Sequence, residues 1–119
     1  MKPVQAPAAG DTPTLTPAMH HILLALLRGE LHGYAIMQSI EALTDGAMRL
    51  GPGTLYTSLR KLLDGALVEE GGERREQGDD ERRRYYRISS AGRAAVVSET
   101  RRLAQLVRFA NRHAFAVLA

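Results

Sequence analysis

Cysteine and tryptophan are absent from this sequence of 119 residues, and long apolar runs are absent as well. Without cysteine the chain has no disulfide, no thiolate nucleophile and no zinc–cysteine site. No apolar run approaches the roughly 20 residues that a membrane-spanning helix needs. The N-terminus is rich in proline and alanine and lacks the apolar segment of a secretory signal. We therefore expect a cytoplasmic protein without a membrane partner.

Residues suited to catalysis or metal binding are also scarce. The sequence has four histidines, and their spacing fits no zinc motif. One of them, His32, is better explained as a turn residue with a structural hydrogen bond. No glycine-rich phosphate loop is present, because Gly51-Pro52-Gly53 lacks the required pattern and its proline removes a donor. These absences argue against an enzyme, and they indicate neither a cofactor nor a metal ion.

The length and composition of the sequence predict one small folded domain. Hydrophobic residues make up 45% of the chain, which is enough for a modest core, and the net charge is +3. Residues 1–14 contain three prolines and a glycine among alanines and are expected to be a disordered tail. The positive charge is compatible with nucleic acid but is weak evidence for it.

The stretch from Leu50 to Leu63 predicts a short helix with two unlike faces. Pro52 suits the first helical position, because its φ is already helical and its missing N–H is not needed there. Leucines at helical spacing form the inward face: Leu55, Leu59, Leu62 and Leu63. The opposite face is small near its start and basic near its end, with Gly53, Thr54, Thr57, Arg60 and Lys61. A helix N-terminus favours phosphate and cations neutralise it, so this face is compatible with DNA as well as with plain solvent exposure.

The other patterns predict two helices before this one and a hairpin after it. Helical stripes begin at Thr16-Pro17 and at Tyr34, and strand-like segments cover 66–70 and 84–88 around a charged loop at 71–83. The predicted class is mainly α with a small β-hairpin, in the order of a winged helix-turn-helix. In that plan the third helix enters the major groove and the hairpin touches the neighbouring DNA backbone or the minor groove. Residues 15–89 are therefore expected to form a DNA-binding domain.

A final helix is predicted over residues 90–119, and its apolar residues repeat in a heptad-like manner. The expected seam consists of Val96, Leu103, Leu106, Val107, Ala110, Ala114 and Val117. At 1.5 Å per residue such a helix is about 43 Å long and would overhang a domain of radius ~13–14 Å. Pairing with a second copy would bury the seam, so we expect a homodimer. The alternative is a helix that folds back on its own core.

Three segments resemble the PadR family of bacterial transcriptional regulators: HGYAI at 32–36, LGPGTLY at 50–56 and RRYYRISSAG at 83–92. The resemblance covers about residues 15–110 and points to the compact branch with a single C-terminal helix. It implies a homodimeric repressor that binds double-stranded operator DNA and is released by a small molecule. It also implies that Tyr56 lies on the DNA-facing side. The ring of Tyr56 packed on the edge of the core is an equally good interpretation.

The charges refine this hypothesis without proving it. Residues 49–87 hold nine basic and eight acidic side chains, so the proposed DNA-reading half is barely positive. The case rests on where cations gather: Arg60 and Lys61 on the helix, and Arg83 and Arg84, next to Arg82, where the hairpin returns. The neighbouring carboxylates should weaken nonspecific attraction to DNA. A winged-helix module that binds protein instead of DNA is the alternative.

The effector is the least defined part of the hypothesis. The resemblance implies a small aromatic or drug-like molecule held between the last helix and the first. Family members with a flat drug site use a tryptophan on the last helix, and this sequence has none. Phe109 and Phe115 are the aromatic residues of that segment, and both are expected in the core or the seam.

Overall fold

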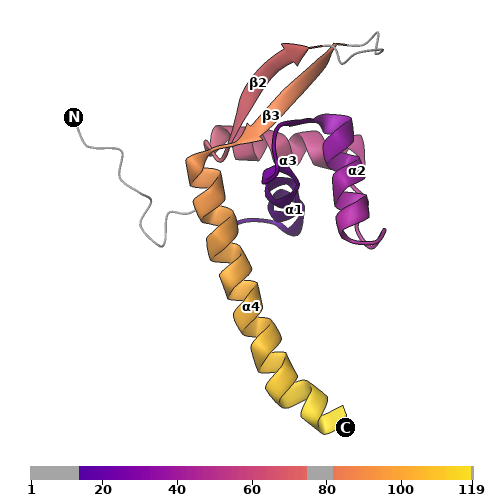
Figure 1. Ribbon diagram of the computed structural model, residues 1–119, viewed down its shortest axis with the longest axis vertical. Coiled ribbons are helices and arrows are strands. Elements are labelled where there is room, and N and C mark those ends of the chain that lie inside the picture. The colour runs from indigo at the N-terminus through magenta and orange to yellow at the C-terminus, as the bar shows by residue number, and fades with distance from the viewer. Residues whose placement is uncertain (1–13, 75–81, 119) are drawn as a thin grey trace, which may run out of the picture.

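A computed structural model of the chain describes the backbone of residues 14–74 and 82–118, with side chains as far as residue 114. The order of elements is α1 (Pro17–Leu26), β1 (Leu31–His32), α2 (Gly33–Leu43), α3 (Pro52–Asp64), β2 (Val68–Arg74), β3 (Arg83–Ile88) and α4 (Ser90–Leu118). Figure 1 shows the β2–β3 hairpin above the first three helices, while α4 leaves this body as one long rod. The predicted class, mainly helical with a small hairpin and a long last helix, is confirmed. The expected tail at 1–14 lies, apart from residue 14, outside the described residues.

The first three helices begin where their capping residues predict. Thr16 precedes α1, and its hydroxyl oxygen accepts a hydrogen bond from the Met19 N–H at 3.1 Å. His32 precedes α2, and its Nδ1 accepts from the Ala35 N–H at 3.1 Å, which confirms the structural hydrogen bond expected of this histidine. The third helix starts at Pro52 as predicted, after Gly51.

The sheet contains a strand that the sequence analysis missed. The strand order is β1-β3-β2, with both pairings antiparallel. A strand of two residues has no alternating pattern, so nothing in the sequence distinguishes β1 from a turn. The hairpin strands are longer than predicted, because β2 extends to Arg74 and β3 begins at Arg83. Of the predicted loop, residue 82 lies outside both strands, and residues 75–81 lie outside the described residues.

A single apolar core joins the helices to the sheet. Its fully buried side chains come from every layer: Ile22, Leu23, Leu26, Ile36, Ile40, Leu55, Leu59, Leu62, Val68 and Val96. Three of the four leucines on the predicted inward face of α3 are therefore core residues, and the fourth, Leu63, packs partly buried against them. Because that face is fixed by packing, the opposite face of α3 is turned to solvent.

The start of α4 is tied to the turn that follows α3. The Ser89 hydroxyl donates to the Ala66 carbonyl at 2.7 Å and accepts from the Gly92 N–H at 3.0 Å. The Ser89 N–H donates to the Leu67 carbonyl at 3.1 Å. Gly92 lies against this turn so closely that a Cβ added to it would be 2.1 Å from the Leu67 oxygen.

The rest of α4 projects beyond the body. The radius of gyration is 16.8 Å and the longest extent 55 Å, against about 14 Å expected of a compact chain of this length. The first turns of α4 pack on the core through Ala95 and Val96. Beyond them the helix exposes large apolar side chains, among them Leu106 at 54% and Val107 at 58%. The chain therefore does not fold its last helix back onto its own core.

One expectation for α4 needs correction. Val96 was expected in a seam between copies, but it is only 2% exposed and belongs to the core of its own chain. Phe109, expected in the core or the seam, is exposed and so lies outside the core, and the centre of its ring is 4.4 Å from that of His113. Its place in a seam stays a prediction. Helical spacing shows which side chains share a face, but it does not show what covers that face. The side chains of Phe115 and Val117 lie outside the described part.

A buried histidine lies where α1 meets α4, and we expect it to make stability depend on pH. His20 is 7% exposed, and its Nε2 lies 3.4 Å from the Thr100 hydroxyl. Burial lowers its pKa, the Glu99 carboxylate opposes this, and His21 and Arg102 add to the lowering. Below the ordinary histidine pKa of about 6.5 the unfolded chain therefore takes up a proton that the folded chain resists.

We expect the free energy of unfolding to fall as pH drops from about 7.5 through 6.5 towards the lowered pKa of His20. The His20→Gln variant removes this titration and should flatten that part of the profile. Urea unfolding followed by circular dichroism at several pH values measures both. Equal slopes in the two proteins would show that His20 does not titrate differently on folding.

Candidate nucleic-acid interface

The outward face of α3 carries all six residues predicted on that helix to meet DNA. Gly53, Thr54, Tyr56, Thr57, Arg60 and Lys61 are all exposed. They occupy the helical positions between the buried residues Leu55, Ser58, Leu59 and Leu62. Gly53 has no atom within 4 Å of an added Cβ, so it leaves open space near the start of the helix. The face is small at its N-terminal end and basic towards its C-terminal end, as the sequence predicts.

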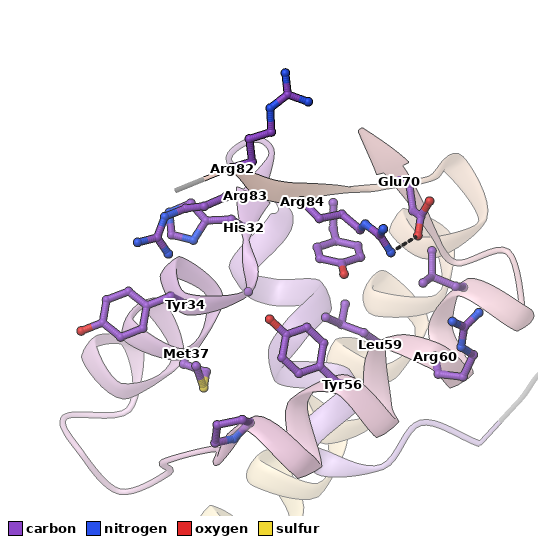
Figure 2. Close-up of a pocket in the computed structure, with 14 residues that line it drawn as sticks. His32, Tyr34, Met37, Tyr56, Leu59, Arg60, Glu70, Arg82, Arg83 and Arg84 are labelled. Atoms are coloured by element: carbon purple, nitrogen blue, oxygen red, sulfur yellow. Dashed lines mark hydrogen bonds and ion pairs between the residues drawn. The ribbon is translucent and has the colours of Figure 1, made fainter. Parts of the chain in front are cut away.

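This face forms a ridge between two open clefts. The first has a volume of about 490 Å³ and lies between α3, the start of α2 and the hairpin. Figure 2 shows Tyr56 and Arg60 rising from α3 on one side of it, and Arg82, Arg83 and Arg84 along the hairpin on the other. The second cleft, of about 600 Å³, lies between α3 and the start of α1 and includes Thr54, Thr57 and Lys61. The structure thus brings the predicted helix and hairpin residues together around one surface.

Tyr56 stands over the start of α2, which explains a glycine that the sequence analysis left without a role. A Cβ added to Gly33 would lie 2.6 Å from the Tyr56 hydroxyl oxygen and 3.3 Å from Cδ2 of Leu55. The ring therefore rests against the backbone of Gly33, and yet 51% of the residue is exposed. Tyr56 packs at the edge of the body, as one of the two interpretations predicts, and it also lines the first cleft. Its contact with DNA stays a prediction. Gly33 stands in the segment HGYAI that carries the resemblance, but only the fold shows that the Tyr56 ring packs against it.

The arginines of the hairpin differ in their surroundings. Arg84 forms ion pairs with Glu70 at 3.4 Å and Glu73 at 3.5 Å, and the Glu70 carboxylate in particular raises its pKa. The guanidinium of Arg83 lies 5.9 Å from the centre of the Tyr34 ring. Arg82 is exposed and lines the first cleft, although it was noted from the sequence only as a neighbour of the predicted contacts.

Two further arginines hold the other face of the hairpin to the body. Glu30 pairs with Arg74 and, at 3.6 Å, with Arg87. These contacts, the hydrogen bond from Arg74 first among them, lower the pKa of the Glu30 carboxyl. Arg74 also lies over the Tyr85 ring at 3.8 Å, and Arg87 pairs with Glu69 at 2.9 Å. These arginines anchor the sheet, so the basic residues near the cleft are fewer than the sequence alone indicates.

Arg60 and Lys61 share α3 but face different clefts. Arg60 lines the first cleft and lies 3.9 Å from Asp64, an exposed pair that contributes little to stability. Lys61 lines the second cleft. A duplex lying along the outward face of α3 would therefore meet one cation on each side of the helix.

Other kinds of site find no support in the described part of the chain. Residues 14–74 and 82–118 contain no cluster of three or more histidine, aspartate or glutamate side chains that could hold a metal ion. The same residues include no helix that is both long and apolar enough to cross a membrane.

Three short helices, an exposed third helix and a hairpin beside it define a winged helix-turn-helix protein, a class built to present one helix to the major groove. The family model of the PadR-like transcriptional regulators matches residues 22–98. The chain therefore belongs to this family, which confirms the resemblance found in three segments of its sequence. The family consists of transcriptional regulators, so the expectation that the chain is not an enzyme is confirmed as well.

Solved structures show the same fold. A transcriptional regulator from Clostridium thermocellum is 24% identical, with a TM-score of 0.67 over 80% of this chain and 90% of that one. A PadR family regulator from Clostridium difficile is 20% identical, with a TM-score of 0.69 over 82% and 97%. Bacillus subtilis PadR, solved in complex with operator DNA, is 21% identical, with a TM-score of 0.60 over 69% of this chain and 45% of that one. No curated protein matches the chain.

Proposed function

We propose that the chain is a homodimeric repressor that binds a palindromic operator and is released from it by a small aromatic effector. The observation that carries the DNA-binding part is the exposed face of α3, which lies between two clefts with Arg60 on one side and Lys61 on the other. The repression and the effector rest on membership of the family. An activity on DNA implies the cytoplasm as its location.

The unpartnered part of α4 supports the homodimer. Leu106 and Val107 are more than half exposed on a helix that projects from the body, and Leu103 and Ala110 lie partly covered on the same side. A second copy would cover this surface. Two copies related by a twofold axis would present their α3 helices about one DNA turn apart, roughly 34 Å, and would therefore favour a palindrome.

Selection of bound sequences from a random duplex pool tests the proposal directly. We expect enrichment of a palindrome, and an affinity that falls steeply with salt because Lys and Arg contacts release counterions from the phosphates. Fluorescence anisotropy of the selected duplex at several salt concentrations measures this. Absence of binding at low salt would favour the alternative, a protein-interaction module. We retain this alternative because arginines of the hairpin are already paired with carboxylates.

Single substitutions on α3 distinguish a base contact from a phosphate contact. We expect Arg60→Ala and Lys61→Ala each to weaken operator binding with the fold intact. Loss of a guanine contact costs about 1–3 kcal/mol and relaxes the sequence preference, whereas loss of a phosphate contact weakens all duplexes alike and lowers the salt slope by about 1. Arg28→Ala, which removes an exposed cation at the end of α1, is the matched control. Unchanged affinity in both α3 variants would remove this helix from the contact surface.

A further inference from the structure

The first cleft contains one negative charge among its arginines. Of the described residues that line it, Glu70 is the only acidic one, and Arg60, Arg82, Arg83 and Arg84 are the basic ones. Figure 2 shows the Glu70 carboxylate reaching from the hairpin towards Arg84, with Arg60 on the α3 side. A surface that only had to attract phosphate would gain nothing from a carboxylate at this point.

The register of the hairpin puts Glu70 there. The regular pairing of β2 with β3 is interrupted between Glu70 and Gly72, so that Glu70 lies opposite Tyr86 while Glu73 lies opposite Arg84. Gly72 at this interruption adopts a positive φ of 94°, a backbone conformation that glycine takes up without strain. As a result both carboxylates reach the same guanidinium, Glu70 at 3.4 Å and Glu73 at 3.5 Å.

This ion pair is open to replacement. The side chains of Arg84 and Glu70 are 52% and 50% exposed, and exposed pairs of this kind contribute little free energy. A DNA phosphate is a strong partner for the same group, because its oxygens match the fork of a guanidinium. Arg84 can therefore exchange its carboxylate for a phosphate when a duplex enters the cleft, at the cost of leaving Glu70 unpaired beside that phosphate.

We propose that Glu70 is a positioning residue that competes with the DNA backbone for Arg84 and so sets the affinity of the hairpin for phosphate. This inference rests on the proposed function, since it assumes that a duplex occupies the cleft. It predicts a change in the less usual direction: removing this side chain's charge strengthens DNA binding. Because phosphate contacts carry no sequence information, the gain applies to operator and to unrelated duplexes alike.

The test compares Glu70→Gln with the unmodified chain on the selected operator and on a random duplex. We expect the variant to bind both about two- to fivefold more tightly, with a salt slope steeper by up to about 1 per bound chain. Glu41→Gln is the matched control. Glu41 is also about half exposed and pairs with Arg49 at 3.3 Å, but it lines neither cleft beside α3. Its substitution removes the same charge.

Combining Glu70→Gln with Arg84→Ala separates a competition for Arg84 from general repulsion. We expect the gain from Glu70→Gln to disappear when Arg84 is alanine. A gain that persists in that background, or one that Glu41→Gln reproduces, overturns the inference. If the unmodified chain itself binds no duplex, the proposed function fails instead, so the two failures are distinguishable.

Discussion

Replacing Gly92 by alanine should destabilise the chain severely, although alanine is the better helix former. In a free helix this change would stabilise by about 1 kcal/mol. Here the new Cβ would lie 2.1 Å from the Leu67 carbonyl oxygen and 2.7 Å from Cγ1 of Ile88. Both the turn after α3 and the first turn of α4 would have to move apart. We expect a loss of about 3 kcal/mol or more, a large part of the roughly 5–15 kcal/mol that holds a domain folded.

Urea unfolding followed by circular dichroism measures this loss, and Gly53→Ala is the control. Gly53 is also in the first turn of a helix, but an added Cβ meets no atom within 4 Å there. That variant should be as stable as the unmodified chain or slightly more stable. If Gly92→Ala unfolds at the same urea concentration as Gly53→Ala, the close approach of α4 to the turn is not a feature of the protein in solution.

Placing two aspartates on the exposed side of α4 should convert the proposed homodimer into monomers. In the double variant Leu103→Asp with Leu106→Asp, pairing of two copies would bury the new carboxylates without partners. The free-energy cost of burying them exceeds the stabilisation that the contact between the two α4 helices supplies. A monomer holds only one half-site. We therefore expect operator affinity to fall about 100-fold or more, as the gain from linking two half-sites is lost.

Light scattering and operator titration together test this outcome. The double variant Ser98→Asp with Gln105→Asp is the matched control, because both residues are exposed and polar and lie on the other side of the helix. It should remain dimeric and bind the operator. A Leu103→Asp, Leu106→Asp protein that keeps the mass of a dimer would show that the copies meet elsewhere, or that α4 has a different partner.

Local signals were enough to predict most of the fold. Thr16 and Pro52 predict where their helices begin, because helix capping and the fixed φ of proline depend only on residues close by in the chain. The outward face of α3 follows from its leucine spacing for the same reason. β1 was missed because a strand of two residues shows no alternation of apolar and polar side chains. The assignment of Val96 was wrong because the apolar spacing runs unbroken along α4. It does not show where the helix stops packing on its own core and begins to project from it.

The site was only partly predictable, since charges act across strands. The arginines at the return of the hairpin were visible in the sequence, but their partners depend on the register of β2 against β3. A single bulge between Glu70 and Gly72 decides which carboxylates reach Arg84. Likewise, Gly33 gained a role only when α3 placed the Tyr56 ring against it. Composition shows how many charges are present, whereas three-dimensional pairing determines which of them a ligand can use.

The hydrogen bonds of Ser89 have a mechanical consequence. They bind the first turn of α4 to Ala66 and Leu67, shortly after the end of α3, so we expect the long helix and the helix proposed to face DNA to move together. In the proposed dimer, a slight rotation of one α4 against the other swings both α3 tips through a much larger arc. Whatever alters the angle between the two rods therefore alters the fit to the pitch of the double helix, even from a point far from the bases.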